Sequence, residues 1–310
     1  MIINTGQRTD IPAFYTPWFL RRIAEGHVVV RSPYNPVRLT RYRLSPDVVD
    51  VIGFCTKNPA PLLPHWREIA KFRQLWHVTI TPYGRDIEPH VPPVSAVIDA
   101  VRQLARFVSP RAIFWRYDPI FISETYPISF HLAAFESMAR ALAGSTRHCI
   151  ISFIDLYKKT RHNFPKAREV PHEVQQRLAS SFVQIGQANG MEILSCLEDH
   201  SLSACGVNTG GCLAKEQIEK ALAITLRPPS NETKQIRAGC DCLLSHDIGA
   251  YNSCAHLCRY CYANSSPAAV RGTMARHDPR SPLLIGRILP GEIIHEARQE
   301  SWIPRETSLF

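Results

Sequence analysis

The stretch Arg111-Ala-Ile-Phe-Trp-Arg116-Tyr-Asp118-Pro119 is an apolar, aromatic run that ends in charged groups. A segment with helical spacing follows at Ser129–Ala143, and His148-Cys-Ile-Ile-Ser-Phe-Ile-Asp155 then repeats the apolar run with a polar end. An apolar strand, a helix and a second apolar strand make one β-α-β unit. The stretch therefore predicts an α/β fold built on a parallel sheet.

The same alternation runs through most of the chain. Runs that favour strands occur at Met1–Asn4, Val49–Cys55, Leu75–Thr81, Arg111–Arg116, His148–Asp155 and Met191–Cys196. Segments with helical spacing lie between them, at Ala13–Glu25, Pro61–Phe72, Val94–Phe107, Ser129–Ala143, His172–Ala188 and Lys215–Ala223. Six units within about 250 residues predict a TIM-like (β/α) barrel, complete or partial, and a doubly wound open sheet is the alternative. His27–Arg31 is expected to add a short strand pair on the rim.

The 310 residues are expected to form one barrel body with a cysteine-rich addition. We place the body at residues 1–235, a cluster-binding loop region packed on the barrel mouth at 236–270, and a C-terminal tail or helix at 271–310. No run approaches the length of a membrane span, and the start at Met1–Arg8 lacks the pattern of a secretory signal. We therefore expect a cytoplasmic protein with no membrane partner.

Charged groups recur where the predicted strands end. The candidate catalytic residues are Arg8, Asp10, Lys57, Arg116, Asp118 and Asp155. Each has an ordinary alternative role in a turn, a helix cap or a salt bridge. Their repetition at the carboxyl ends of strands favours a polar site at one mouth of a barrel, where arginines bind carboxylate or phosphate.

A second signal is Cys254-Ala-His-Leu-Cys258-Arg-Tyr260-Cys261, in which three thiols are spaced C-x3-C-x2-C. Three cysteines on one loop can hold three corners of a [4Fe-4S] cluster, and the fourth iron then stays open to a ligand that is not protein. Structural zinc is the alternative, but it would need His256 or another cysteine as a fourth ligand.

Eight of the ten cysteines lie in the last 115 residues. In a reducing compartment this density favours metal chemistry over disulfides. Cys196, Cys212, Cys240 and Cys242 number four, enough for a second cluster or a zinc site, and Cys205 is a substitute ligand. Cys55 and Cys149 sit in strand-like runs, where an inert buried thiol is expected.

The chain resembles the DUF1848 family of uncharacterised proteins over residues 1 to about 265. The stretches that carry the resemblance begin at Arg8-Thr-Asp-Ile-Pro, Arg31-Ser-Pro-Tyr, Thr56-Lys-Asn-Pro, Tyr83-Gly-Arg-Asp, Trp115-Arg-Tyr-Asp, Ile151-Ser-Phe-Ile-Asp and Asp247-Ile-Gly-Ala-Tyr. That resemblance favours Cys196, Cys212, Cys240 and Cys242 over Cys205 as the second ligand set.

The cysteine motif also resembles that of radical S-adenosylmethionine (SAM) enzymes, and its Tyr-Cys-Tyr setting resembles the spore photoproduct lyase branch. This resemblance implies that the open iron chelates SAM and that one electron, from a donor such as flavodoxin or ferredoxin, cleaves SAM to methionine and a 5′-deoxyadenosyl radical. The radical would remove a hydrogen from a small-molecule or nucleic-acid substrate that the sequence does not name.

Two departures from the radical SAM pattern stand out. The motif lies near residue 254 instead of after the first strand, and the chain has no Gly-Gly-Glu segment. In a barrel the last strand neighbours the first, so a loop after the last strand would face Arg8 and Asp10. Arg8, Lys57 or Arg116 would then bind the SAM carboxylate. Asp10, Asp118 or Asp155 would bind its ribose or the substrate, and Tyr260 would shield the cluster from solvent.

Two functions of other classes compete with this hypothesis. One is a metal-stabilised binding protein, with iron–sulfur or zinc, whose partner could be a nucleic acid; the net charge of +9 suits this, although the basic residues are spread along the chain. The other is a (β/α)-barrel hydrolase or lyase that uses the Asp and Arg residues directly.

Overall fold

The computed structural model describes residues 1–304 apart from positions 197, 199, 231–240 and 244–245. Its centre is a six-stranded sheet in which all neighbouring strands run parallel. In spatial order the strands are β1 (Ile2–Asn4), β4 (Val51–Thr56), β5 (Gln74–Thr79), β6 (Ile113–Ile120), β7 (His148–Phe153) and β8 (Glu192–Ser195). All six predicted strands are confirmed, and with them the α/β class. The described residues do not close the sheet into a barrel, because β1 and β8 remain its two edges.

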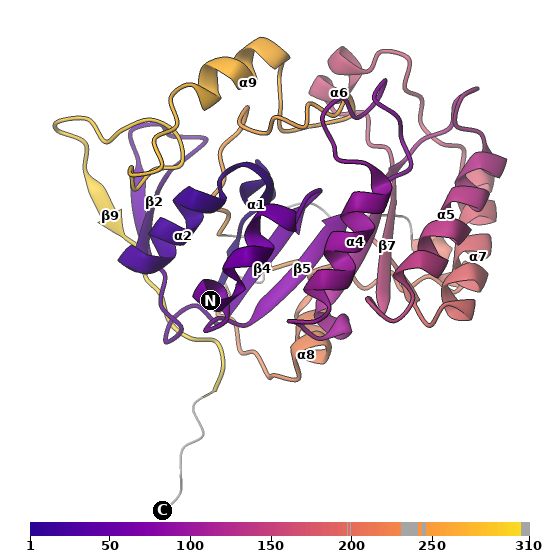
Figure 1. The fold of residues 1–310 in the computed structure, drawn as a ribbon, viewed down its shortest axis with the longest axis horizontal. Helices are drawn as coiled ribbons and strands as arrows, with labels where there is room; N and C mark the ends of the chain where they lie inside the picture. The colour runs from indigo at the N-terminus through magenta and orange to yellow at the C-terminus, as the bar shows by residue number, and fades with distance from the viewer. Residues whose placement is uncertain (197, 199, 231–240, 244–245, 305–310) are drawn as a thin grey trace, which may run out of the picture.

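Helices surround this sheet (Figure 1). They are α1 (Ile11–Phe14), α2 (Thr16–Glu25), α3 (Trp66–Ile69), α4 (Val94–Leu104), α5 (Ile128–Leu142), α6 (Lys158–Asn163), α7 (His172–Ala188), α8 (Lys215–Leu222) and α9 (Pro267–Met274). Two of them, α6 and α9, lie beyond one end of the strands of the sheet, at the top of Figure 1. Short 3-10 helices lie at η1 (Ala60–His65), η2 (Pro110–Ala112) and η3 (His200–Cys205). The Phe135 ring of α5 stacks on the Phe182 ring of α7 at 4.0 Å, which ties the helices into the core. No helix in the described part of the chain could cross a membrane.

Proline divides two of the predicted helices. The segment expected at Ala13–Glu25 is broken at Tyr15, and Pro17 stands in the first turn of α2. The segment expected at Pro61–Phe72 becomes η1 and then α3, with Pro64 inside the 3-10 part. Proline lacks a backbone N–H and clashes with the preceding turn, so it suits a helix start and interrupts a helix interior.

A second, three-stranded sheet stands beside the first. It contains β2 (His27–Arg31), β3 (Leu39–Arg43) and β9 (Ile294–Glu296), with β2 antiparallel to β3 and β3 parallel to β9. The predicted strand at His27–Arg31 is confirmed, whereas β3 and β9 were not predicted. A guanidinium–carboxylate pair between Arg41 and Glu296, 2.8 Å apart, joins the early strands to the end of the chain.

Irregular segments continue the main sheet beyond both of its edges. At β1, the Asn4 N–H donates to the His246 carbonyl (2.8 Å) and the Ile248 N–H donates to the Asn4 carbonyl (2.9 Å). At β8, the Asn208 N–H donates to the Ile193 carbonyl (2.9 Å). The two segments are joined where the Leu243 N–H donates to the Leu213 carbonyl (3.0 Å). We call this region, residues 207–214 and 241–248 as far as described, the seam.

Candidate functional site

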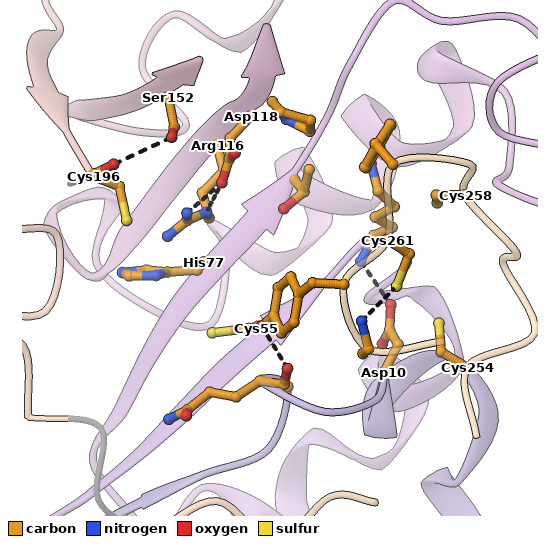
Figure 2. Close-up of a pocket in the computed structure, with 18 of the residues that line it drawn as sticks. Asp10, Cys55, His77, Arg116, Asp118, Ser152, Cys196, Cys254, Cys258 and Cys261 are labelled. Carbon is orange, nitrogen blue, oxygen red and sulfur yellow. Dashed lines mark hydrogen bonds and ion pairs between the residues drawn. The ribbon is translucent and has the colours of Figure 1, made fainter. Parts of the chain in front are cut away.

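A cavity of about 300 Å³ opens at the carboxyl ends of the six parallel strands. Figure 2 shows its two sides, with His77, Arg116 and Cys196 on one and Cys254, Cys258 and Cys261 on the other. Five of the predicted catalytic residues line it: Asp10, Lys57, Arg116, Asp118 and Asp155. Arg8 is not among the lining residues.

Cys254, Cys258 and Cys261 all line this cavity. The Cys258 side chain is buried and the other two are half-buried. Burial raises the pKa of all three thiols, and the positive charge of Lys57 partly offsets this at Cys258 and Cys261. Among the residues that the structure describes, no three His, Cys, Asp or Glu side chains are already arranged as a metal-binding group. The segment therefore gathers three thiols on one wall beside a cation; we call residues 254–261 the motif loop.

His256, inside the motif loop, is held by Asp10. Its Nε2 lies 3.0 Å from the Asp10 carboxylate and its Nδ1 lies 3.3 Å from the His90 carbonyl, with 2% of the residue exposed. An acceptor therefore faces each ring nitrogen, and both nitrogens are engaged within the protein. A zinc site that recruits His256 would have to break one of these contacts.

Asp10 makes three further contacts. It accepts from the Thr56 hydroxyl (2.7 Å), from the Lys57 backbone N–H (2.8 Å) and, as the N-cap of α1, from the Ala13 N–H (3.0 Å). A carboxylate offers about four acceptor positions, so the side chain is saturated. Asp10 therefore ties the loops after β1 and β4 to the motif loop.

Glu88 makes a second anchor, on the loop between β5 and α4. Its buried carboxylate accepts from the Lys57 ammonium (2.9 Å), from the Thr81 hydroxyl (2.6 Å) and from the Tyr260 hydroxyl. The Lys57 Nζ also lies 5.6 Å from the centre of the Tyr260 ring. Glu88 was missed as a site residue, although it lies in the Tyr83–Pro89 stretch that carries the family resemblance.

Arg8 instead holds the seam to β1. Its Nε lies 2.8 Å from the Asp247 carboxylate, and the Gln7 N–H donates to the other oxygen of that carboxylate at 2.8 Å. The Arg8 guanidinium also lies 6.0 Å from the centre of the Tyr251 ring. Asp247 therefore orients the chain that leads into the motif loop, and the structure brings that loop to Asp10 as expected while leaving Arg8 outside the cavity.

Arg116 and Asp118 form an ion pair at the end of β6. The Arg116 Nε donates to the Asp118 carboxylate at 3.1 Å, and its Nη1 donates to the Cys212 sulfur at 3.4 Å. Asp155 is exposed at the cavity edge, where it accepts from the Tyr157 hydroxyl at 2.9 Å. The cavity is thus lined by the cationic side chains of Lys57 and Arg116, and the exposed Asp155 carboxylate lies at its edge.

Three more cysteines meet across the cavity from the motif loop. The Cys212 sulfur lies 3.5 Å from that of Cys196 and 3.7 Å from that of Cys242, and the Leu213 N–H donates to the Cys242 sulfur at 3.1 Å. Hydrogen bonds from the neighbouring thiols hold the pKa of Cys212 well below its ordinary value. We call Cys196, Cys212 and Cys242 the second cysteine group; Cys240, also predicted as a ligand, lies outside the described residues.

Cys205 lies elsewhere. Its thiol donates to the Gln176 carbonyl of α7 at 3.7 Å, and it does not line the cavity. The preference for the other cysteines as metal ligands stays a prediction.

His77 was also missed as a site residue, and Glu198, a polar residue at the end of the sixth predicted strand, was not among the candidate catalytic residues. His77, on β5, lines the cavity with 1% of the residue exposed, and burial lowers its pKa to about 4. Glu198 accepts from the Ser152 hydroxyl (2.8 Å) and the Phe153 N–H (2.7 Å), and burial raises its pKa to about 7. His77 lies inside the predicted strand Leu75–Thr81, and a histidine in mid-strand gives no sequence signal that separates a ligand from a core residue.

The family model described as "Domain of unknown function (DUF1848)" matches residues 2–263. The chain belongs to the DUF1848 family. No curated protein matches it. Among solved structures, "Crystal Structure of Citrate Synthase SbnG" is similar over 67% of this DUF1848 chain and 82% of that chain, with 11% sequence identity and a TM-score of 0.25. So low a score carries no argument about the fold or the function.

Proposed function

We propose that this DUF1848 chain is a radical SAM enzyme with a [4Fe-4S] cluster on Cys254, Cys258 and Cys261. One observation supports the proposal above all: the three motif thiols and the carboxyl ends of the six strands line one cavity. When bound, such a cluster would use its open iron to chelate SAM and would supply the electron that releases a 5′-deoxyadenosyl radical.

The donor set of the motif loop suits three-thiolate ligation. The side chains of His256 and Tyr260 are held by Asp10 and Glu88. Cysteine thiols are then the soft metal donors that the loop presents to the cavity, and they number three. A closed structural zinc site needs four ligands, whereas a cubane with an open iron needs three.

The charges around the loop also suit an anionic cluster. The positive charge of Lys57 acts on Cys258 and Cys261, and that of Lys159 acts on Cys261. The Lys159 Nζ is fixed by the Ala263 carbonyl at 3.3 Å and lies 4.8 Å from the centre of the Tyr251 ring. Two cations at partly buried positions would offset part of the negative charge that three thiolates bring.

The contacts narrow the set of residues that would bind SAM or the substrate. Arg8 is engaged by Asp247 away from the cavity, and Asp10 has no acceptor position left. Arg116 has five N–H donors, of which two go to Asp118 and one to Cys212, so two remain for a ligand carboxylate. Asp118 and Asp155 remain as acceptors for hydroxyl groups.

The test is anaerobic purification and cluster reconstitution, followed by an assay for dithionite-dependent 5′-deoxyadenosine formation from SAM. The wild type should bind about four iron and four sulfide at the motif loop and should form 5′-deoxyadenosine. A variant with Cys254→Ala, Cys258→Ala and Cys261→Ala should lose both. Cys149→Ala is the matched control, because Cys149 is fully buried in β7 and does not line the cavity.

Two outcomes would contradict the proposal. The first is a reconstituted wild type that holds the cluster and neither binds nor cleaves SAM, which would leave the metal-stabilised binding protein. The second is activity of any kind that survives in the triple variant, which would favour a hydrolase or lyase that uses the cavity carboxylates.

The role of Arg116 is tested separately by Arg116→Lys in the reconstituted protein. The variant keeps the charge but loses the planar array of donors, so SAM affinity should fall while the iron content stays unchanged. Unchanged SAM affinity would remove Arg116 from the binding site.

A further inference from the structure

His77 and Cys196 lie on the side of the cavity away from the motif loop (Figure 2), and Cys212 and Cys242, which complete the second cysteine group, also line the cavity. His77 comes from β5, Cys196 from the end of β8, and Cys212 and Cys242 from the two halves of the seam. These four residues are far apart in the sequence, and only the fold brings them together.

The sulfur distances in this group indicate the size of the centre that it can hold. The Cys212 sulfur lies 3.5 Å and 3.7 Å from its two neighbours. Sulfur ligands about 2.3 Å from one tetrahedral metal ion lie about 3.8 Å from each other. In a cubane each thiolate binds a different iron, which requires wider spacing. The observed distances therefore fit a single metal ion better than a second [4Fe-4S] cluster.

His77 supplies an independent observation that points to a ligand. Its ring is buried, and among the described residues neither ring nitrogen has a hydrogen-bond partner of normal geometry, although Cys212 lies close enough to affect its pKa. A buried imidazole with two unmade hydrogen bonds is costly unless another partner satisfies it. Figure 2 shows the ring on the same side of the cavity as Cys196.

We propose that Cys196, Cys212, Cys242 and His77 bind one tetrahedral metal ion, Zn²⁺ or Fe²⁺, which closes the seam between β8 and β1. Three thiolates with one imidazole are a ligand set that both ions accept. Each thiol releases its proton to solvent on binding, and the net charge of the centre becomes −1. Arg116 already donates to the Cys212 sulfur and offsets that charge.

The position of this ion gives it a structural role. The sheet pairs its strands continuously from β1 to β8, but across the seam only isolated bridges are present in the described residues. The proposed metal ion would be bonded to β5, to the end of β8 and to both seam segments. It would therefore stabilise the seam, where backbone hydrogen bonds between the described residues are fewest. Preformed geometry is not required, because metal binding itself can order the ligands.

The test uses the full chain with Cys254→Ala, Cys258→Ala and Cys261→Ala, so that the result does not depend on the proposed function. After gel filtration this variant should retain about one equivalent of zinc or iron without acid-labile sulfide. X-ray absorption of the zinc form should show three sulfur neighbours at about 2.3 Å and one nitrogen at about 2.0 Å. Four sulfur neighbours would overturn the assignment of His77. Four iron with four sulfide, or no bound metal, would overturn the site.

Variants in the same background give a second readout with Co²⁺ as the probe. Cys212→Ala should abolish the thiolate-to-cobalt absorption band. His77→Gln should weaken Co²⁺ binding by more than the about 10–100-fold that loss of a second-shell partner costs. His148→Gln is the matched control, since His148 stacks on Phe114 in the same sheet but does not line the cavity. Equal Co²⁺ affinity in the His77 and His148 variants would contradict the proposal.

Discussion

The motif loop and the second cysteine group face each other across one cavity, yet the fold holds them in different ways. The motif loop is contiguous, and buried polar contacts from Asp10 and Glu88 anchor its side chains. The second group is drawn from three separate segments, and its sulfurs contact each other. The difference indicates that the motif loop is positioned by the protein itself, whereas the seam would gain order from what its thiols bind.

The largest effect on stability is expected from Asp10→Ala, which tests whether the motif loop depends on its Asp10 anchor. The substitution leaves His256 buried without its partner and removes the N-cap of α1. The free energy of unfolding should therefore fall by about 3–5 kcal/mol, the usual cost of breaking a buried pair. Urea-induced unfolding measures this. Thiol alkylation followed by mass spectrometry should show faster labelling of Cys258 with no change at Cys212.

The control for Asp10 is Asp155→Ala, on the same cavity but exposed. It should change the free energy of unfolding by no more than about 0.5 kcal/mol. If Asp10→Ala were as mild as this control, the motif loop would not depend on its Asp10 anchor and the contrast with the seam would fail.

The second prediction concerns Glu198, which accepts from the Ser152 hydroxyl beside Cys196. Its pKa is about 7 in the folded protein, above the ordinary glutamate value of 4.5, so the folded state holds the proton more tightly. Its contribution to stability is therefore present below pH 4.5 and is lost as the pH rises through 7. At 1.36 kcal/mol per pKa unit the loss is at most about 3 kcal/mol.

Urea unfolding of the wild type and of Glu198→Gln at both ends of that pH window measures the contribution. Glutamine stays neutral, so the variant should gain stability relative to the wild type as the pH rises. A difference between the two proteins that stays constant with pH would show that burial does not raise the pKa of Glu198.

The six strands were predictable because each is an apolar run of the right length, and runs such as His148–Phe153 are buried on both faces of a parallel sheet. Strands β3 and β9 were missed for the opposite reason. Leu39–Arg43 carries more polar than apolar residues, and Ile294–Glu296 has three residues that pair with a partner about 250 positions away. Neither has a local signal strong enough to be recognised.

The same distinction between local signals and long-range contacts applies to the site. The spacing of Cys254, Cys258 and Cys261 is local, so the sequence shows that these three thiols belong together. The Asp10–His256 contact joins residues 246 positions apart, and two charged side chains at such a separation have many alternative partners. Only the three-dimensional structure shows which partner is used. Arg8 pairs with Asp247, although the sequence had suggested that Arg8 binds the SAM carboxylate.

A smaller effect is expected from Tyr260→Phe. The change removes the hydrogen bond to Glu88 and keeps the ring beside the Lys57 ammonium. Hydrogen bonds to charged groups contribute about 1.5–3 kcal/mol, so a loss near 2 kcal/mol is expected in urea unfolding. Tyr262→Phe is the comparison, because its hydroxyl donates to the neutral Gln7 carbonyl at an exposed position and should cost about 1 kcal/mol or less. Equal losses would mean that the Glu88 anchor is no stronger than a surface contact.

The smallest effect is expected from Cys205→Ala, which sharpens the boundary of the second cysteine group. The Cys205 thiol is half-buried and its hydrogen bond goes to α7, so its removal should cost about 1 kcal/mol or less. Bound metal, measured per chain after gel filtration, should equal that of the wild type, whereas Cys212→Ala should lower it. A loss of metal in the Cys205 variant as large as in the Cys212 variant would place Cys205 in the second cysteine group, and the seam would then exchange ligands in a way that the present contacts do not show.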